Sequence, residues 1–114
     1  MMKRINLSIS KDFSPTPGGR YKAEGDNSGE EFRDLLLFPK FKEAMEKKAK
    51  LMIDLDGCMG FPSSFLDESF GGLARKLNLK SDKILEIIEF KSDDQPSLVK
   101  EIEKIIQISV HGRG

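Results

Sequence analysis

The run "KLMIDLD" at residues 50–56 constrains the fold more than any other stretch of the chain. Leu51, Ile53 and Leu55 fall on one side of an extended segment, and Met52 falls on the other. A short run that is apolar on both sides is typical of a strand inside a sheet, with neighbouring strands beside it. We therefore expect a central strand here.

Other segments predict the rest of an α/β layer. The strands expected besides the central one are "KRINLSIS" (3–10), a short "RYKAE" (20–24) in a long loop, and "KILEIIEF" (83–90). Helices are expected from residue 28, over about 64–77, and within "SDDQPSLVKEIEKIIQIS" (92–109). This order of elements predicts a small mixed sheet with helices packed on it.

The helices carry local signals of their own. "SGEE" offers Ser28 as a cap with Glu31 three residues later, and Pro39 predicts a break or kink near Phe38. The last helix is expected to start with Asp caps, at Asp93 and Asp94, and an early Pro. The stripe that should bury the second helix consists of Leu66, Phe70, Leu73 and Leu77.

Length and charge limit the function classes. The 114 residues fit a single domain, 1–114, and 19 Lys and Arg balance 19 Asp and Glu. Without a basic field, nucleic acid and anionic membranes are not expected partners. The lone Cys58 cannot form an internal disulfide, and "MMKRINLSIS" lacks the apolar run of a signal peptide, so we expect a cytoplasmic protein. His111 has no Cys or second His near it and is given no role.

Ser63 and Ser64 open the second helix, and two interpretations stay open. A hydroxyl at this position commonly caps the helix, and Ser64 with Asp67 has that spacing. The same end of a helix also favours negative charge, so a phosphate on either serine would be tolerated and would add about two charges to a neutral surface.

Gly71 and Gly72 stand in the middle of the same helix. Each glycine destabilises a helix interior by about 1 kcal/mol relative to alanine, so something must need small side chains there. Two explanations stay open: a close helix contact within the domain, or a partner surface. The residues of that surface would be Phe65, Glu68, Gly71, Gly72 and Arg75.

The long loop contains a candidate anion site. Arg20, together with Ser28 and Gly29 at the following helix start and Asp56 after the central strand, could surround an anion. The loop does not match the nucleotide-binding pattern G-x-x-x-x-G-K-[ST]. As an alternative, Arg20 or Arg33 pairs with one of three carboxylates, Asp26, Asp54 or Asp56, and holds the loop against the sheet.

The run "MIDLDGCMGFPSSFLDESFGGLARKL" resembles the central strand, loop and helix of STAS domains, the fold of bacterial anti-sigma factor antagonists. The chain is still more similar to the STAS-like family of unassigned function, through "GGRYKAEGDNSGEEFRDLLLFP" and "SSFLDESFGGL". The resemblance implies a STAS-like fold, Ser64 at the position of the phosphorylated serine, and a protein partner with the histidine-kinase-like ATPase fold.

A rival motif overlaps the central strand. "LMIDLDGC" is similar to the first motif of haloacid dehalogenase-type phosphotransferases, which would make Asp54 the nucleophile and Asp56 the acid/base, with Asp93 and Asp94 as distant magnesium ligands. Such enzymes need a larger domain and a later Lys. We therefore expect a non-enzymatic bacterial signalling module without metal or cofactor, and a homodimerisation domain is the third alternative.

Overall fold

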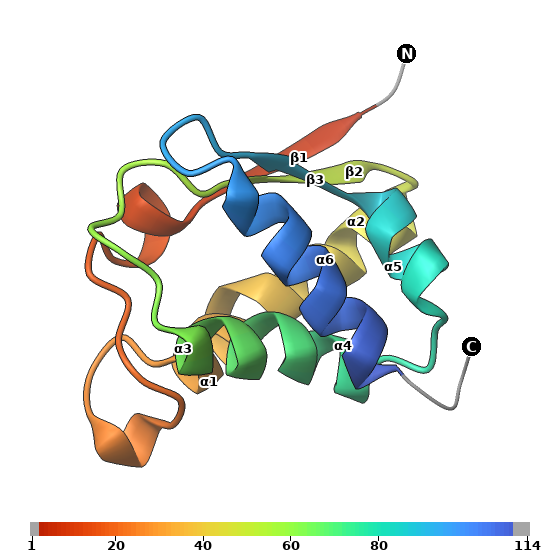
Figure 1. The fold of residues 1–114 in the computed structure, drawn as a ribbon. Helices are drawn as coiled ribbons and strands as arrows, with labels where there is room; N and C mark the ends of the chain where they lie inside the picture. Colours follow the sequence, from red (N-terminus) through yellow and green to blue (C-terminus); the bar gives the residue numbers. More distant parts are fainter. Residues whose placement is uncertain (1–2, 111–114) are drawn as a thin grey trace.

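The computed structural model describes residues 3–110, and His111 lies outside them (Figure 1). Its sheet has three parallel strands in the order β1–β2–β3: β1 (Arg4–Ser8), β2 (Lys50–Asp54) and β3 (Ile88–Lys91). The central position of β2 is confirmed, because Ile53 pairs with Leu7 on one side and with Phe90 on the other.

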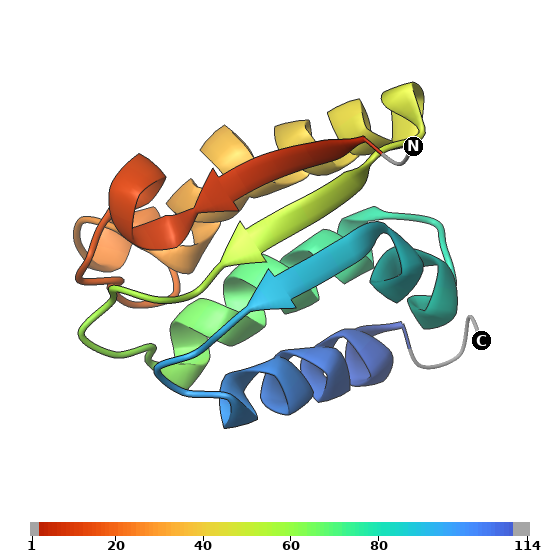
Figure 2. The same cartoon turned by 90° about the horizontal axis from the view of Figure 1, so that it is seen from above.

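Helical segments fill the connections: η1 (Ile9–Phe13), η2 (Lys22–Glu24), α1 (Gly29–Phe32), η3 (Arg33–Leu37), α2 (Phe38–Lys47), α3 (Ser63–Leu66), η4 (Asp67–Gly71), α4 (Gly72–Lys76), α5 (Ser81–Ile87) and α6 (Ser97–Ser109). The long helices pack against one face of the sheet, which Figure 1 shows edge-on and Figure 2 from above. The short turn η2 lies in the loop away from the sheet and has no buried residue. The α/β class is confirmed. Leu51 and Ile53 face the helices and are fully buried, whereas Met52 lies on the other face of the sheet and is half-buried.

Two expected strands are corrected. "RYKAE" forms the 3-10 turn η2, so the described sheet is parallel throughout rather than mixed. In "KILEIIEF", the first half belongs to α5 and only Ile88 onward is strand. Ile84 is the buried residue of α5, and Ile88 is the buried first residue of β3.

Of the predicted break or kink near Phe38, the break is wrong. Leu37 and Phe38 keep right-handed helical backbone angles, and α1, η3 and α2 form one helix over residues 29–47. The π-helical turn η3 precedes the proline, and the Phe38 N–H donates to the Arg33 carbonyl across it. Pro39 has no N–H to donate to the preceding turn, and the π-helical turn η3 lies directly before it in the chain.

The second long helix covers residues 63–76 and is built in the same way, from α3, the π-helical turn η4 and α4. Its predicted apolar stripe is confirmed: Leu66, Phe70 and Leu73 are fully buried, and Leu77 is 9 % exposed. In the last helix, α6, Asp93 and Asp94 do not form the cap, because Pro96 occupies that position.

Candidate functional site

Helix 63–76 begins without a side-chain cap. Pro62 occupies the cap position, and its carbonyl accepts hydrogen bonds from the backbone N–H groups of Phe65 and Leu66. Within residues 3–110, the hydroxyls of Ser63 and Ser64 make no hydrogen bond. The capping interpretation of Ser64 is therefore corrected, and both hydroxyls are unengaged. Ser63 is exposed and Ser64 is partly buried.

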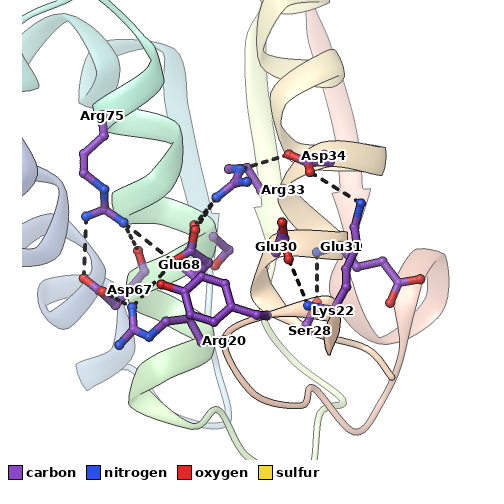
Figure 3. Close-up of polar contacts among 12 residues, drawn as sticks. Arg20, Lys22, Ser28, Glu30, Glu31, Arg33, Asp34, Asp67, Glu68 and Arg75 are labelled. Carbon is purple, nitrogen blue, oxygen red and sulfur yellow. Dashed lines mark hydrogen bonds and ion pairs between the residues drawn. The ribbon is translucent and has the colours of Figure 1, made fainter. Parts of the chain in front are cut away.

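A network of arginines and carboxylates covers the next turn of this helix (Figure 3). Arg20 pairs with Asp67 and lies 3.6 Å from the Glu68 oxygen Oε1. Arg33 donates to Glu68 Oε2 at 2.5 Å, and Arg75 lies 3.9 Å from Asp67 Oδ1. The hydrogen bond to Asp67 raises the pKa of the Arg20 guanidinium, and Arg20 is an ordered loop anchor rather than a free anion ligand.

The glycine pair serves contacts within the domain. A Cβ on Gly72 would lie 2.5 Å from Arg33 Nη1, and one on Gly71 would lie 2.8 Å from the Ser109 hydroxyl. Both glycines and Phe65 are buried. The expected partner surface is corrected for these three residues, because they have no accessible face.

Two of the expected surface residues remain in contact with solvent. Arg75 is exposed, and the side chain of Glu68 is 13 % exposed. Glu68 is moreover engaged by Arg33, so of the expected surface only Arg75 is exposed, and its guanidinium contacts Asp67 and Ser109.

The start of helix 29–47 is also fully used inside the domain. The Ser28 hydroxyl accepts a hydrogen bond from the Glu31 N–H at 3.0 Å, which confirms it as a cap, and Ser28 is fully buried. Glu31 itself accepts from the Asn27 N–H. A Cβ on Gly29 would lie 2.6 Å from the Phe65 carbonyl oxygen, so glycine lets the two helices approach closely.

Asp56 belongs to a different cluster, at the carboxyl end of the sheet. Its carboxylate accepts hydrogen bonds from the Asp94 N–H at 2.9 Å and from Lys91 Nζ at 2.7 Å. The Asp94 amide and the Lys91 ammonium hold the pKa of Asp56 below its usual value. The expected anion site is therefore corrected, because Asp56 lies in a different cluster from Arg20. The alternative is corrected as well: Arg20 and Arg33 pair with Asp67, Glu68 and Asp34, and not with Asp26, Asp54 or Asp56.

The residues of the rival phosphotransferase motif are tied into this cluster. The Asp54 carboxylate accepts the Asp56 N–H at 2.9 Å, and the Asp94 carboxylate accepts the Gly57 N–H at 3.1 Å. Lys91 Nζ lies 2.7 Å from Asp56 Oδ2, so an ammonium group already compensates the charge of this carboxylate. Across residues 3–110, no group of three or more His, Cys, Asp or Glu side chains is arranged to hold a metal ion.

One surface feature was not expected from the sequence. A hollow of about 410 Å³ lies directly before Ser63 and is lined by Thr16, Pro17, Met59, Gly60, Phe61 and Pro62. Met59 is 84 % exposed at its edge. The sequence signal for this hollow is the pair Met59 and Phe61 in the segment "GCMGFP". A loop that only faces solvent has no need of two large apolar side chains.

A family model for the STAS-like domain of unknown function (DUF4325) matches residues 28–98, more than half of the chain. The chain belongs to this family. The match runs from the Ser28 cap to the start of α6, so the STAS-like domain includes the serines and the carboxylates of helix 63–76. No curated protein and no solved structure gives a match. None of the helices within residues 3–110 is long and apolar enough to cross a membrane.

Proposed function

We propose that this STAS-like domain is a non-enzymatic regulatory module that binds a protein partner at the start of helix 63–76. The observation that carries the proposal is the pair of unengaged hydroxyls, Ser63 and Ser64, at a helix start beside an apolar hollow. Met59 offers a partner a flexible apolar contact, and a phosphate on either serine would alter the charge of the same contact.

The ion pairs one helical turn further along offer a way for phosphorylation of Ser63 or Ser64 to change the structure of the surface. The Asp67 N–H donates to the carbonyls of Ser63 and Ser64, so the serine side chains lie one helical turn before Asp67 and Glu68. A phosphate there competes with Asp67 for Arg20. Because Arg20 anchors the 18–28 loop, phosphorylation would change both the charge and the shape of the surface.

The partner class follows from the resemblance to anti-sigma factor antagonists, which bind ATPases with the histidine-kinase-like fold. A bacterial cytoplasmic signalling role belongs to the same proposal. Catalysis through Asp54 and Asp56 is disfavoured because Lys91 and backbone amides already satisfy these carboxylates. Homodimerisation is the competing role, and it would use the same surface.

A pulldown from the native cytoplasm tests the proposal, with the wild-type domain, Ser63→Asp/Ser64→Asp and Met59→Ser as baits. Lys100→Gln on α6 is the matched control, because it removes an exposed charge far along the chain from the helix start. We expect a partner that both test variants bind more weakly and the control binds normally, and a recovered wild-type domain heavier by one phosphate. Equal capture by all four baits would contradict the proposed surface, and a concentration-dependent dimer without a partner would favour the competing role.

A further inference from the structure

A second cavity lies at the other end of the sheet, where β2 begins. Its volume is about 440 Å³, within the range of small-molecule sites. It lies between the end of α2 and α5, which Figure 1 shows near the first residues of β2. Its apolar wall consists of Ala44, Met45, Ala49 and Ile87, and Met45 is 40 % exposed.

The polar residues around this cavity are predominantly basic. Lys48, Lys50 and Lys83 line it together with a single acidic residue, Glu86. Lys50 Nζ donates to the backbone carbonyl of Glu86 and so joins the two walls. Within residues 3–110, the ammonium groups of Lys48 and Lys83 form no ion pair.

The placement of Lys48 adds a second observation. Lys48 ends α2 with φ 54° and ψ 43°, the left-handed conformation that helix ends usually give to Gly or Asn. A lysine here bears backbone strain that glycine would avoid, and Lys48 is one of the residues that line the cavity. The neighbouring Lys47, in contrast, is paired with Glu43.

We propose that this cavity binds a small amphipathic anion, a carboxylate carried on a hydrocarbon chain. The apolar wall buries the chain, and the unpaired ammonium groups of Lys48 and Lys83 bind the carboxylate at the rim. A neutral ligand would leave those charges unused, and a small inorganic anion would leave Met45 and Ile87 exposed. This site is separate from the helix start of the proposed function, and neither depends on the other.

Decanoate is the probe, and the methyl group of Met45 is the reporter. In protein labelled with ¹³C at the methionine methyl groups, we expect decanoate below its micelle concentration to shift the Met45 signal saturably. The signal of Met59, at the distant hollow, should not move. Decanol has the same chain without the charge and should bind about tenfold more weakly.

The variant Lys48→Gln/Lys83→Gln should also weaken decanoate binding by about tenfold, since it removes both free ammonium groups. Lys100→Gln/Lys104→Gln on α6 removes two exposed charges elsewhere and should bind like wild type. The inference is overturned if Met45 shows no saturable shift, if decanol binds as tightly as decanoate, or if the two double variants behave alike. The comparison of decanoate with decanol requires no variant and therefore does not depend on any effect of mutation on folding.

Discussion

Arg33 contacts Glu68 at two points, donating from Nη1 to the carboxylate oxygen Oε2 at 2.5 Å and to the backbone carbonyl oxygen at 3.2 Å. The two side chains are 8 % and 13 % exposed, so both charges are largely desolvated. The pair joins helix 29–47 to helix 63–76, and each partner depends on the other for compensation of its buried charge.

Replacing Arg33 by Met should lower the free energy of unfolding by about 2 kcal/mol, because Glu68 is left partly buried without its main partner. Urea denaturation followed by circular dichroism measures the change. Lys47→Gln is the control, since the ion pair of Lys47 with Glu43 is exposed and its loss should leave the midpoint nearly unchanged. Equal shifts of the urea midpoint for the two variants would show that the ion pair of Arg33 with Glu68 does not stabilise the fold.

Gly72→Ala should lower the free energy of unfolding by about 1–2 kcal/mol, because the new Cβ would lie 2.5 Å from Arg33 Nη1 and 3.1 Å from its Cδ. Arg33 cannot easily move while it is bound to Glu68 and Asp34. This clash outweighs the helix propensity that alanine gains.

Gly71→Ala provides the matched comparison, and urea denaturation of both glycine variants measures the two changes. Its Cβ would meet the ends of the Ser109 and Arg75 side chains, which can turn away. We expect stability within about 0.5 kcal/mol of wild type. A Gly71 variant less stable than the Gly72 variant would contradict this assignment of the two glycines.

Ser64→Ala should leave stability unchanged within about 0.5 kcal/mol, because its hydroxyl does not cap the helix. Ser28→Ala should lower the free energy of unfolding by about 1 kcal/mol, since that hydroxyl accepts the Glu31 N–H. Thermal unfolding of both variants separates the two serines. A loss at Ser64 as large as that at Ser28 would restore the capping role expected from the sequence.

The Asp56 cluster should make stability depend on acidity. The pKa of Asp56 in the folded chain lies below the ordinary value of 3.8, because the Asp94 amide and Lys91 bind the ionised form. The contribution of the Asp56 carboxylate to the free energy of unfolding is therefore fully present above pH 3.8. It is lost as the pH falls through the lower pKa of the folded state. Unfolding midpoints measured between pH 6 and pH 2 should fall less steeply for Asp56→Asn than for wild type. Parallel curves would mean that Asp56 does not contribute to the acid response.

Cys58 should react slowly with thiol reagents. Burial, reinforced by the nearby Asp54 charge, raises the pKa of its thiol to about 11. Since the thiolate is the reactive form, alkylation by iodoacetamide at pH 8 should be about 100-fold slower than that of a free cysteine. Intact mass measured over time gives the rate. A rate close to that of free cysteine would show that the thiol is neither buried nor raised in pKa.

Local patterns predicted what local contacts determine. The alternation in β1 and β2, the Ser28 cap and the stripe of helix 63–76 each depend on residues close together in the chain. In "KILEIIEF" the apolar residues fit both periods, and only packing decides that Ile84 lies in a helix.

The ion pairs of the candidate site could not be predicted in this way. Arg20 and Arg33 bind Asp67 and Glu68, some forty positions further along the chain, and the choice among many carboxylates is made by the crossing of two helices. The unengaged serines follow from Pro62, whose fixed backbone takes the cap position.

The π-helical turn η4 lies between the serines and Gly72 and ends at Gly71, and this affects how the chain is compared with its relatives. A π-helical turn contains about one residue more than an α-helical turn. A relative with a regular α-helix would therefore reach its small residues one position sooner. Such a relative could be aligned on β2 or on the glycines Gly71 and Gly72. The two alignments would differ by one position at the helix start, so one would select Ser63 and the other Ser64. Which of the two serines corresponds to a given residue of a relative is thus decided by where the gap is placed.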